Sequence, residues 1–393
     1  MGKKRYKRNI VQVADQVSGS PDLTLGALIP AEDITLTVTV RPNGNTFTCD
    51  IANFPHMVHA PMTWKWADFE AELDALAPYA RQLSKPGAAT PDVIQEIAAR
   101  GKILFEKVFA TDAARSAIRD ACAGPGATEI LFYTDSFALC WPLLYLGTDI
   151  QKVEVEQFLG MRASILRTLQ STTNEASQSR RDDAPIGSAV RLNYAWDKSF
   201  KQIETRERPY MVELDVKLDQ PRVSVFEVPA LEPNGPAFAQ AKELFDGLNR
   251  EEPKIIHLSC HYEAGEELAS KRFRLRDGAF VTFHQMSATE VTFTSRPLLF
   301  FNACEVAKLK PDRTENFPEY CMRMGAECIV APEFEVHDFG AADMAEVFYD
   351  KLLKDRRSIS DALHDAKMHL WTEKKSLTGL LYAVYGQSYR TYQ

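Results

Sequence analysis

The stretch RPLLFFNACEVAK, residues 296–308, holds a run of large apolar residues that ends at a cysteine, Cys304. A second run of this kind, KIIHLSCHYEAG at 254–265, ends at a histidine, His261. Short continuous apolar runs are typical of strands that are buried on both faces of a parallel sheet. Ligands bind outside the carboxyl ends of such strands, so we expect a thiol and an imidazole at one edge of the sheet.

The residues around these two runs alternate between strand-like and helix-like segments. Strands are predicted at RPYMVELDVKL (208–218), RVSVFEV (222–228) and CIVAP (328–332), and a hairpin at 272–284 turns at Asp277-Gly278. Helical spacing of apolar residues predicts helices near 237–250, 315–325, 339–354 and 358–371. Strands separated by helices predict an α/β fold with a largely parallel sheet.

The N-terminal part of the chain has a different pattern. Two alternating apolar and polar runs flank Asn43-Gly44, which is a strong hairpin signal. Helices are predicted at 66–82, 91–109 and 112–122. The polar segment 171–185 predicts a flexible linker, in which the Arg180-Arg181 pair is either a self-cleavage site or part of an ordinary exposed loop.

Composition limits the class of protein. A chain of 393 residues predicts two or three domains, and a net charge of −8 argues against direct binding of nucleic acid. No apolar stretch is long enough for a membrane helix, and the basic start MGKKRYKRNI lacks the apolar run of a secretory signal. The seven cysteines are an odd number in mostly apolar surroundings, which favours reduced thiols and a cytoplasmic protein.

The two strand ends carry the residue types of a cysteine nucleophile and its base. A histidine near a thiol can take its proton and so produce a strong nucleophile, which needs no cofactor. A metal site is the alternative, with the ligands His257, Cys260, His261 and His284. Their spacing matches no zinc pattern, and neighbouring strand residues point to opposite faces, so no metal is expected. His257 is expected to be a hydrogen-bonded core histidine or a neighbour of the site.

The segments of this region, in their order and spacing, resemble the CHAT domain, a caspase-like peptidase domain of the caspase and separase group. The matching segments are IIHLSCH, LRDGAFVTFHQM, PLLFFNACEVA, MGAECIVAPEFEVHDFGAADMAEVFYDKLL and SISDALHDAKMHLW. The upstream segment ILFYTDSFALCWPLLYLG (130–147) is similar to an element on the N-terminal side of such domains. The resemblance implies a caspase-like fold and does not reach residues 1–60.

The resemblance assigns a catalytic dyad to His261 and Cys304. Cys304 would attack the scissile carbonyl, and His261 would protonate the leaving amine and later activate water. The oxyanion hole would use the backbone N–H of Cys304 and one just after His261, at Tyr262. The family usually has glycine at that second position, so Tyr262 puts the donor or the width of the cleft in question.

Four carboxylates are expected near the same edge: Glu305, Glu333, Glu335 and Asp338. They would suit a lysine or arginine side chain at the cleaved position of a protein substrate. The alternative is that they form a solvated rim and that Asp338 caps the helix that starts at 339.

The residues and the family resemblance together predict a cysteine endopeptidase, with an activating partner or ligand left open. That it cleaves a specific protein partner is implied by the resemblance. The family resemblance adds a role in a defence pathway, including antiviral defence, or in cell death. The predicted organisation is a hairpin region (1–60), a helical region that is a pseudo-caspase half (61–170), the linker (171–185) and the catalytic domain (186–393). The rival hypotheses are a catalytically silent binding or scaffold protein and a metal-dependent hydrolase.

Overall fold

The computed structural model describes residues 36–53, 56–124, 128–134, 137, 139–168, 189–197, 199–214, 223–229, 231, 235–263, 272–275, 279–289, 291–304, 317–386 and 391–392. The segment 171–185, with Arg180 and Arg181, lies outside these residues, so the linker stays a prediction.

The centre of the molecule is an 11-stranded sheet with the order β3-β2-β1-β4-β5-β14-β13-β12-β8-β6-β7. Its strands are β1 (Leu36–Asn43), β2 (Thr46–Asn53), β3 (His56–Pro61), β4 (Thr128–Thr134), β5 (Ala163–Thr168), β6 (Val190–Trp196), β7 (Val223–Glu227), β8 (Ile255–Ser259), β12 (Leu298–Asn302), β13 (Cys328–Pro332) and β14 (Tyr382–Gly386). The pairings β1–β2, β2–β3 and β13–β14 are antiparallel, and the other seven are parallel. This confirms the α/β fold with a largely parallel sheet.

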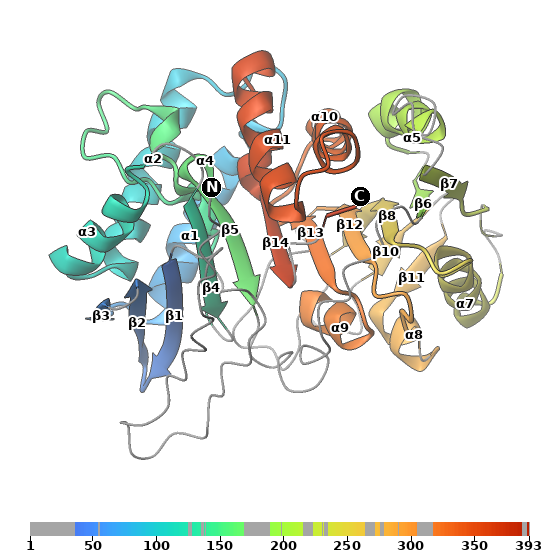
Figure 1. The fold of residues 1–393 in the computed structure, drawn as a ribbon, viewed down its shortest axis with the longest axis horizontal. Helices are drawn as coiled ribbons and strands as arrows, with labels where there is room; N and C mark the ends of the chain where they lie inside the picture. Colours follow the sequence, from blue (N-terminus) through green and yellow to red (C-terminus); the bar gives the residue numbers. More distant parts are fainter. Residues whose placement is uncertain are drawn as a thin grey trace, which may run out of the picture.

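Helices cover both faces of this sheet (Figure 1). They are α1 (Trp66–Leu83), α2 (Pro91–Val108), α3 (Asp112–Ala121), α4 (Leu159–Arg162), α5 (Arg208–Val212), α7 (Ala237–Leu248), α8 (Phe283–Ala288), α9 (Phe317–Arg323), α10 (Asp338–Tyr349) and α11 (Ile359–Lys374). In the C-terminal half, α5, α10 and α11 lie on one side of the sheet and α7, α8 and α9 on the other (Figure 1). Strands β8, β12 and β13 are buried along their whole length because both faces are covered.

The apolar side chains of these strands divide between two cores. Ile255 and Phe300 belong to the larger core, whereas Ile256 and Phe301 belong to the smaller one. Neighbouring strand residues point to opposite faces, so one continuous apolar run fills both cores. This is why the runs in the sequence do not alternate.

The N-terminal hairpin has the predicted form. β1 and β2 pair in register around Gly44 and Asn45, with Asn43 opposite Thr46, and Gly44 has a φ of +60°. A left-handed turn residue of this kind favours glycine. β1 and β2 alternate between buried and less buried residues because only one of their faces is fully covered.

The predicted strand at 208–218 is wrong where the structure describes it. Residues 203–207 form a π-helical turn, η5 (Ile203–Glu207), which continues into α5. Tyr210, Met211 and Leu214 are the buried positions, and this is helical spacing. The strand that precedes this segment, β6, has a nearly continuous buried pattern and was not predicted.

The sheet continues from the N-terminal half into the C-terminal half through the parallel pair β5–β14, where Arg167 lies opposite Tyr385. A second, three-stranded sheet has the order β11-β10-β9, with β9 (His261–Glu263), β10 (Arg272–Arg274) and β11 (Phe280–Thr282). Its antiparallel pair β10–β11 confirms the two predicted strands, while the predicted turn at Asp277-Gly278 lies outside the described residues and residues 283–284 begin α8. The domain boundaries that we predicted remain predictions.

Candidate active site

Two neighbouring parallel strands end at the same edge of the sheet. Ser259 at the end of β8 lies opposite Asn302 at the end of β12. His261 and Cys304 each follow two residues later. The chain order alone cannot create this arrangement, because it depends on β8 and β12 being direct neighbours in register.

Cys304 differs from the other cysteines in its exposure. All seven cysteines lie in the described part of the chain, and Cys304 is half-buried while the other six are buried. Burial raises the pKa of the Cys122 thiol to about 11, and the pKa of Cys260 well above its ordinary value. The Cys304 Sγ donates a hydrogen bond to the Val336 carbonyl oxygen at 3.6 Å. A nucleophile must be reachable, and Cys304 is the cysteine that meets this requirement best.

His261 is held between two elements. It begins β9 and lies opposite Arg274 of β10. The ring of Phe200 stacks on its imidazole, with the centroids 3.8 Å apart and an angle of 30° between the planes. Arg274 Nε donates to the buried Asp197 carboxylate at 3.2 Å. The imidazole therefore has an aromatic ring against one of its faces.

Tyr262 occupies the position where the family usually has glycine, and its ring packs away from this edge. The ring centroid lies 5.2 Å from that of Phe273 and 6.2 Å from that of Phe317. Both phenylalanines belong to the smaller core. The partly buried Tyr262 side chain thus packs against the smaller core. The role of its backbone N–H as an oxyanion donor remains a prediction.

A buried polar network lies directly behind the two strand ends. The Asn302 amide donates to Glu207 at 2.7 Å and to the Ala341 carbonyl oxygen at 3.0 Å, and its oxygen accepts from the Tyr382 hydroxyl at 2.7 Å. The other Glu207 oxygen contacts His257 Nε2 at 2.7 Å and accepts from the Ser259 hydroxyl. These contacts join β8, β12, η5 and α10, so they stiffen the base of the site.

His257 is a hydrogen-bonded core histidine, which was one of the two predictions made for it from the sequence. It is 1% exposed, and its second ring nitrogen contacts the Tyr349 hydroxyl at 2.9 Å. Within the described ranges, no group of three or more histidine, cysteine, aspartate or glutamate side chains could hold a metal ion.

The four carboxylates expected at this edge have different surroundings. Glu305 lies outside the described residues. Glu333 is in the core rather than on a solvated rim, because both of its oxygens accept hydrogen bonds from the buried Arg167. Glu335 is 43% exposed and forms an ion pair with Arg81. Asp338 is the first residue of α10, and its carboxylate accepts from the Gln202 N–H at 3.2 Å; the N-cap of that helix is His337.

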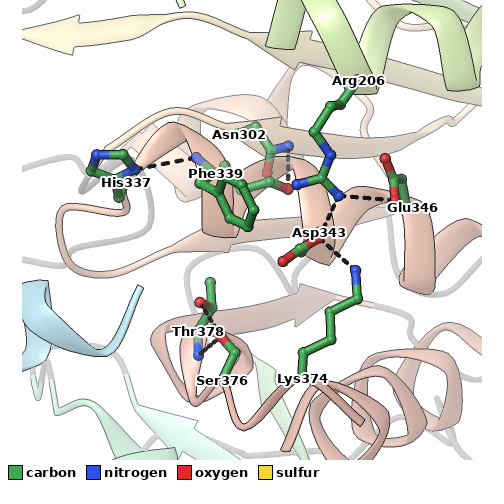
Figure 2. Close-up of polar contacts among 10 residues, drawn as sticks. Arg206, Asn302, His337, Phe339, Asp343, Glu346, Lys374, Ser376 and Thr378 are labelled. Atoms are coloured by element: carbon green, nitrogen blue, oxygen red, sulfur yellow. Dashed lines mark hydrogen bonds and ion pairs between the residues drawn. The ribbon is translucent and has the colours of Figure 1, made fainter. Parts of the chain in front are cut away.

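The sequence reasoning missed the segment that follows β6, residues 197–214. The Asp197 N–H donates to the Ser259 carbonyl oxygen at 2.8 Å, which ties the segment to the end of β8. Farther along, Arg206 donates to Asp343 and Glu346 of α10 and lies over the ring of Phe339 (Figure 2). Recognising β6 would have revealed this segment, since an aspartate at the end of a buried strand is placed like His261 and Cys304.

The Asp343 carboxylate that binds Arg206 also binds a residue of α11. Lys374 donates to the same Asp343 oxygen that accepts from Arg206, at 2.5 Å (Figure 2). Asp343 is only 4% exposed, so its charge is balanced by two cations in the interior of the contact. The loop that carries Phe200 is therefore attached at both ends to the sheet and to the helices above it.

The fold is similar to that of separase. Two crystal structures of the Saccharomyces cerevisiae separase–securin complex, at 3.0 and 2.6 Å resolution, match with TM-scores of 0.55 and 0.53 and identities of 8% and 9%. Each match covers 90% of this chain and 30% of the other chain, so this chain spans about a third of the separase length. Caspase-1 from Spodoptera frugiperda matches with a TM-score of 0.30 and 11% identity over 52% of this chain and 90% of its own.

The model of the CHAT domain matches residues 77–385, and the chain belongs to this family. No curated protein matches the chain in sequence. The family match begins within α1 and ends in β14, so it includes most of the N-terminal half as well as the site. Among the residues described, no helix is long and apolar enough to cross a membrane.

Proposed function

We propose that the chain is a caspase-like cysteine endopeptidase in which Cys304 is the nucleophile and His261 the general acid and base. The observation that carries the proposal is the register of β8 and β12, with His261 and Cys304 each two residues beyond the pair Ser259–Asn302. The half-buried state of Cys304 among six buried cysteines supports the assignment.

The proposed reaction is peptide hydrolysis through a thioester. The Cys304 thiolate attacks the scissile carbonyl carbon, and the backbone N–H of Cys304 and that of Tyr262 stabilise the oxyanion. His261 gives a proton to the leaving amine, so the C–N bond breaks and the acyl group stays on sulfur. Water then attacks the thioester while His261 takes its proton, and the carboxylate product leaves with the thiol restored.

We further propose that the side chain before the cleaved bond is lysine or arginine. Glu335 and Asp338, whose side chains are 43% and 17% exposed, carry negative charge beside the loop that contacts Cys304. Asp197 adds a third carboxylate next to the His261 strand. Attraction of a cationic side chain to this edge would raise the affinity for basic substrates. A role in defence or cell death rests on the family resemblance alone, and a cytoplasmic location on the cysteine usage of the sequence.

Labelling with electrophilic peptide probes tests the proposal. A lysine- or arginine-directed probe should label Cys304 of the full chain, as mapped by mass spectrometry, and His261→Ala should abolish the labelling. His284→Ala is a matched control, because His284 is an exposed histidine on α8. A folded protein in which no probe labels Cys304 above the other cysteines would favour a binding or scaffold protein.

A further inference from the structure

The loop that contacts Cys304 is held by the N-terminal half of the chain. This loop, residues 333–337, follows β13, and its Val336 carbonyl oxygen accepts the Cys304 thiol hydrogen bond. The C-terminal end of α1 holds it at two points. Arg81 forms an ion pair with Glu335, and the Ser84 hydroxyl oxygen accepts from the His337 N–H at 2.8 Å.

The first residue of loop 333–337 is anchored more deeply. Glu333 binds Arg167 of β5 through both carboxylate oxygens, and the Glu333 N–H donates to the Leu381 carbonyl oxygen at 2.8 Å. Arg167 also donates to the Tyr385 hydroxyl at 2.8 Å. Since Arg167 is 1% exposed and Glu333 6%, water does not compete for these contacts.

The other end of loop 333–337 packs tightly on the same helix end. A side chain at Gly340, in the first turn of α10, would lie 2.6 Å from the Ser84 carbonyl oxygen and 2.6 Å from the Thr378 hydroxyl oxygen. The loop thus has little room to shift away from Cys304 while α1 stays in place.

We propose that Arg81, Ser84 and Arg167 are positioning residues that hold loop 333–337 so that the Val336 carbonyl oxygen keeps the Cys304 thiol protonated. β13 and β8 lie on opposite sides of β12, so this contact approaches Cys304 from the side away from the His261 strand. A thiol has one proton, and a hydrogen bond donated by it stabilises the neutral form. The inference rests on the proposed function, because it concerns the reactivity of its nucleophile.

Two of the carboxylates expected to bind substrate attach the loop in this arrangement. The buried Glu333 binds Arg167 of β5, and the partly exposed Glu335 binds Arg81 of α1. The N-terminal half then belongs to the active site, and a protein that draws the end of α1 away from the loop would make the thiol more reactive.

The test uses the full chain with the variants Ser84→Ala and Glu335→Gln. The first removes the acceptor of the His337 N–H, and the second removes the charge that binds Arg81. We expect iodoacetamide to alkylate Cys304 roughly two- to fivefold faster at pH 7 in each variant, since a net hydrogen-bond contribution is weakened. The midpoint of the pH dependence of alkylation should move to lower pH.

Ser358→Ala is the matched control. The Ser358 hydroxyl accepts from the Asp361 N–H at 3.1 Å at the start of α11, so its loss removes a similar contact from another segment. The control should leave the alkylation rate and its pH midpoint unchanged. A merely destabilised protein would instead expose all of its cysteines together.

An unchanged or slower rate in both loop variants overturns the proposal. If Ser84→Ala fails to fold, Glu335→Gln decides, because Glu335 is 43% exposed. The reactivity of Cys304 in the wild-type chain shows whether the loop contact or the proposed peptidase function is wrong. A wild-type Cys304 no more reactive than the buried cysteines argues against the peptidase, whereas a reactive Cys304 with unchanged variants argues against the loop contact alone.

Discussion

Replacing Arg167 with methionine would leave the Glu333 carboxylate without its cation where the two side chains are only 1% and 6% exposed. Glu333 would lose both hydrogen bonds from the guanidinium, and the Tyr385 hydroxyl oxygen would lose a third. Removing one partner of a buried ion pair costs about 3–5 kcal/mol, because the remaining charge stays buried.

The buried Lys367 decides where in this range the loss of stability of Arg167→Met is expected to lie. Burial is the main reason that the pKa of Lys367 falls from 10.5 to about 8; the nearby Arg167 charge also lowers it, whereas Cys140 and Glu333 raise it. In Arg167→Met the pKa of Lys367 would therefore rise. The Lys367 side chain would keep its proton and its positive charge would balance part of the Glu333 charge. The expected loss in the free energy of unfolding is at the lower end, about 3 kcal/mol.

Urea unfolding followed by circular dichroism measures this loss. The double variant Arg167→Met/Glu333→Leu removes both charges and should recover at least half of it, since a buried pair and an apolar replacement differ little in stability. A loss below about 1 kcal/mol in Arg167→Met, or a double variant less stable than Arg167→Met, would contradict a stabilising role of the buried pair. Arg357→Met is the control, because its ion pair with Asp365 is partly exposed and should contribute below about 1 kcal/mol.

Three further predictions concern single residues. The pKa of Lys367 is about 8 in the folded chain and 10.5 in the unfolded chain, so the unfolded chain binds more protons between these pH values. The free energy of unfolding of the wild type, compared with that of Lys367→Met, should therefore increase as pH rises from about 8 to 10.5. Urea unfolding in which both proteins show the same pH dependence would contradict this. Phe200→Leu should slow probe labelling of Cys304 roughly three- to tenfold, because His261 loses its stacked ring, and Phe200→Tyr should restore it; equal rates in all three proteins would exclude a role for stacking. Tyr382→Phe should lower the free energy of unfolding by about 1–3 kcal/mol, since the Asn302 oxygen loses its donor, and a loss below about 0.5 kcal/mol in urea unfolding would show that the contact is unimportant.

Elements that depend on local properties of the chain were predictable from its residues. The Asn43-Gly44 turn between alternating runs predicted β1 and β2, because glycine at a positive φ and a period of two are local properties. The apolar runs that end at His261 and Cys304 predicted buried strands, because only a strand covered on both faces has a continuous apolar run. The order of these runs also carried the family resemblance.

Local patterns failed where tertiary contacts outweigh them. The segment after β6 has alternating residues that favour a strand, but Glu207 bonds to His257 and Arg208 to Glu227, and these partners favour a helical path. Likewise, the sequence indicates that Glu333 is charged but not that Arg167 lies beside it, since 166 residues separate them along the chain.

The assembly of the candidate site depends on contacts between segments that are distant in the chain. The sequence predicted that His261 and Cys304 end two strands, yet their neighbourhood depends on β8 and β12 pairing directly. The stacking of Phe200 and the contact of Val336 with Cys304 depend on segments that lie far apart in the chain. The residue pattern of a strand indicates which of its faces are buried but not which strand is its neighbour. The register between strands is set when the sheet packs.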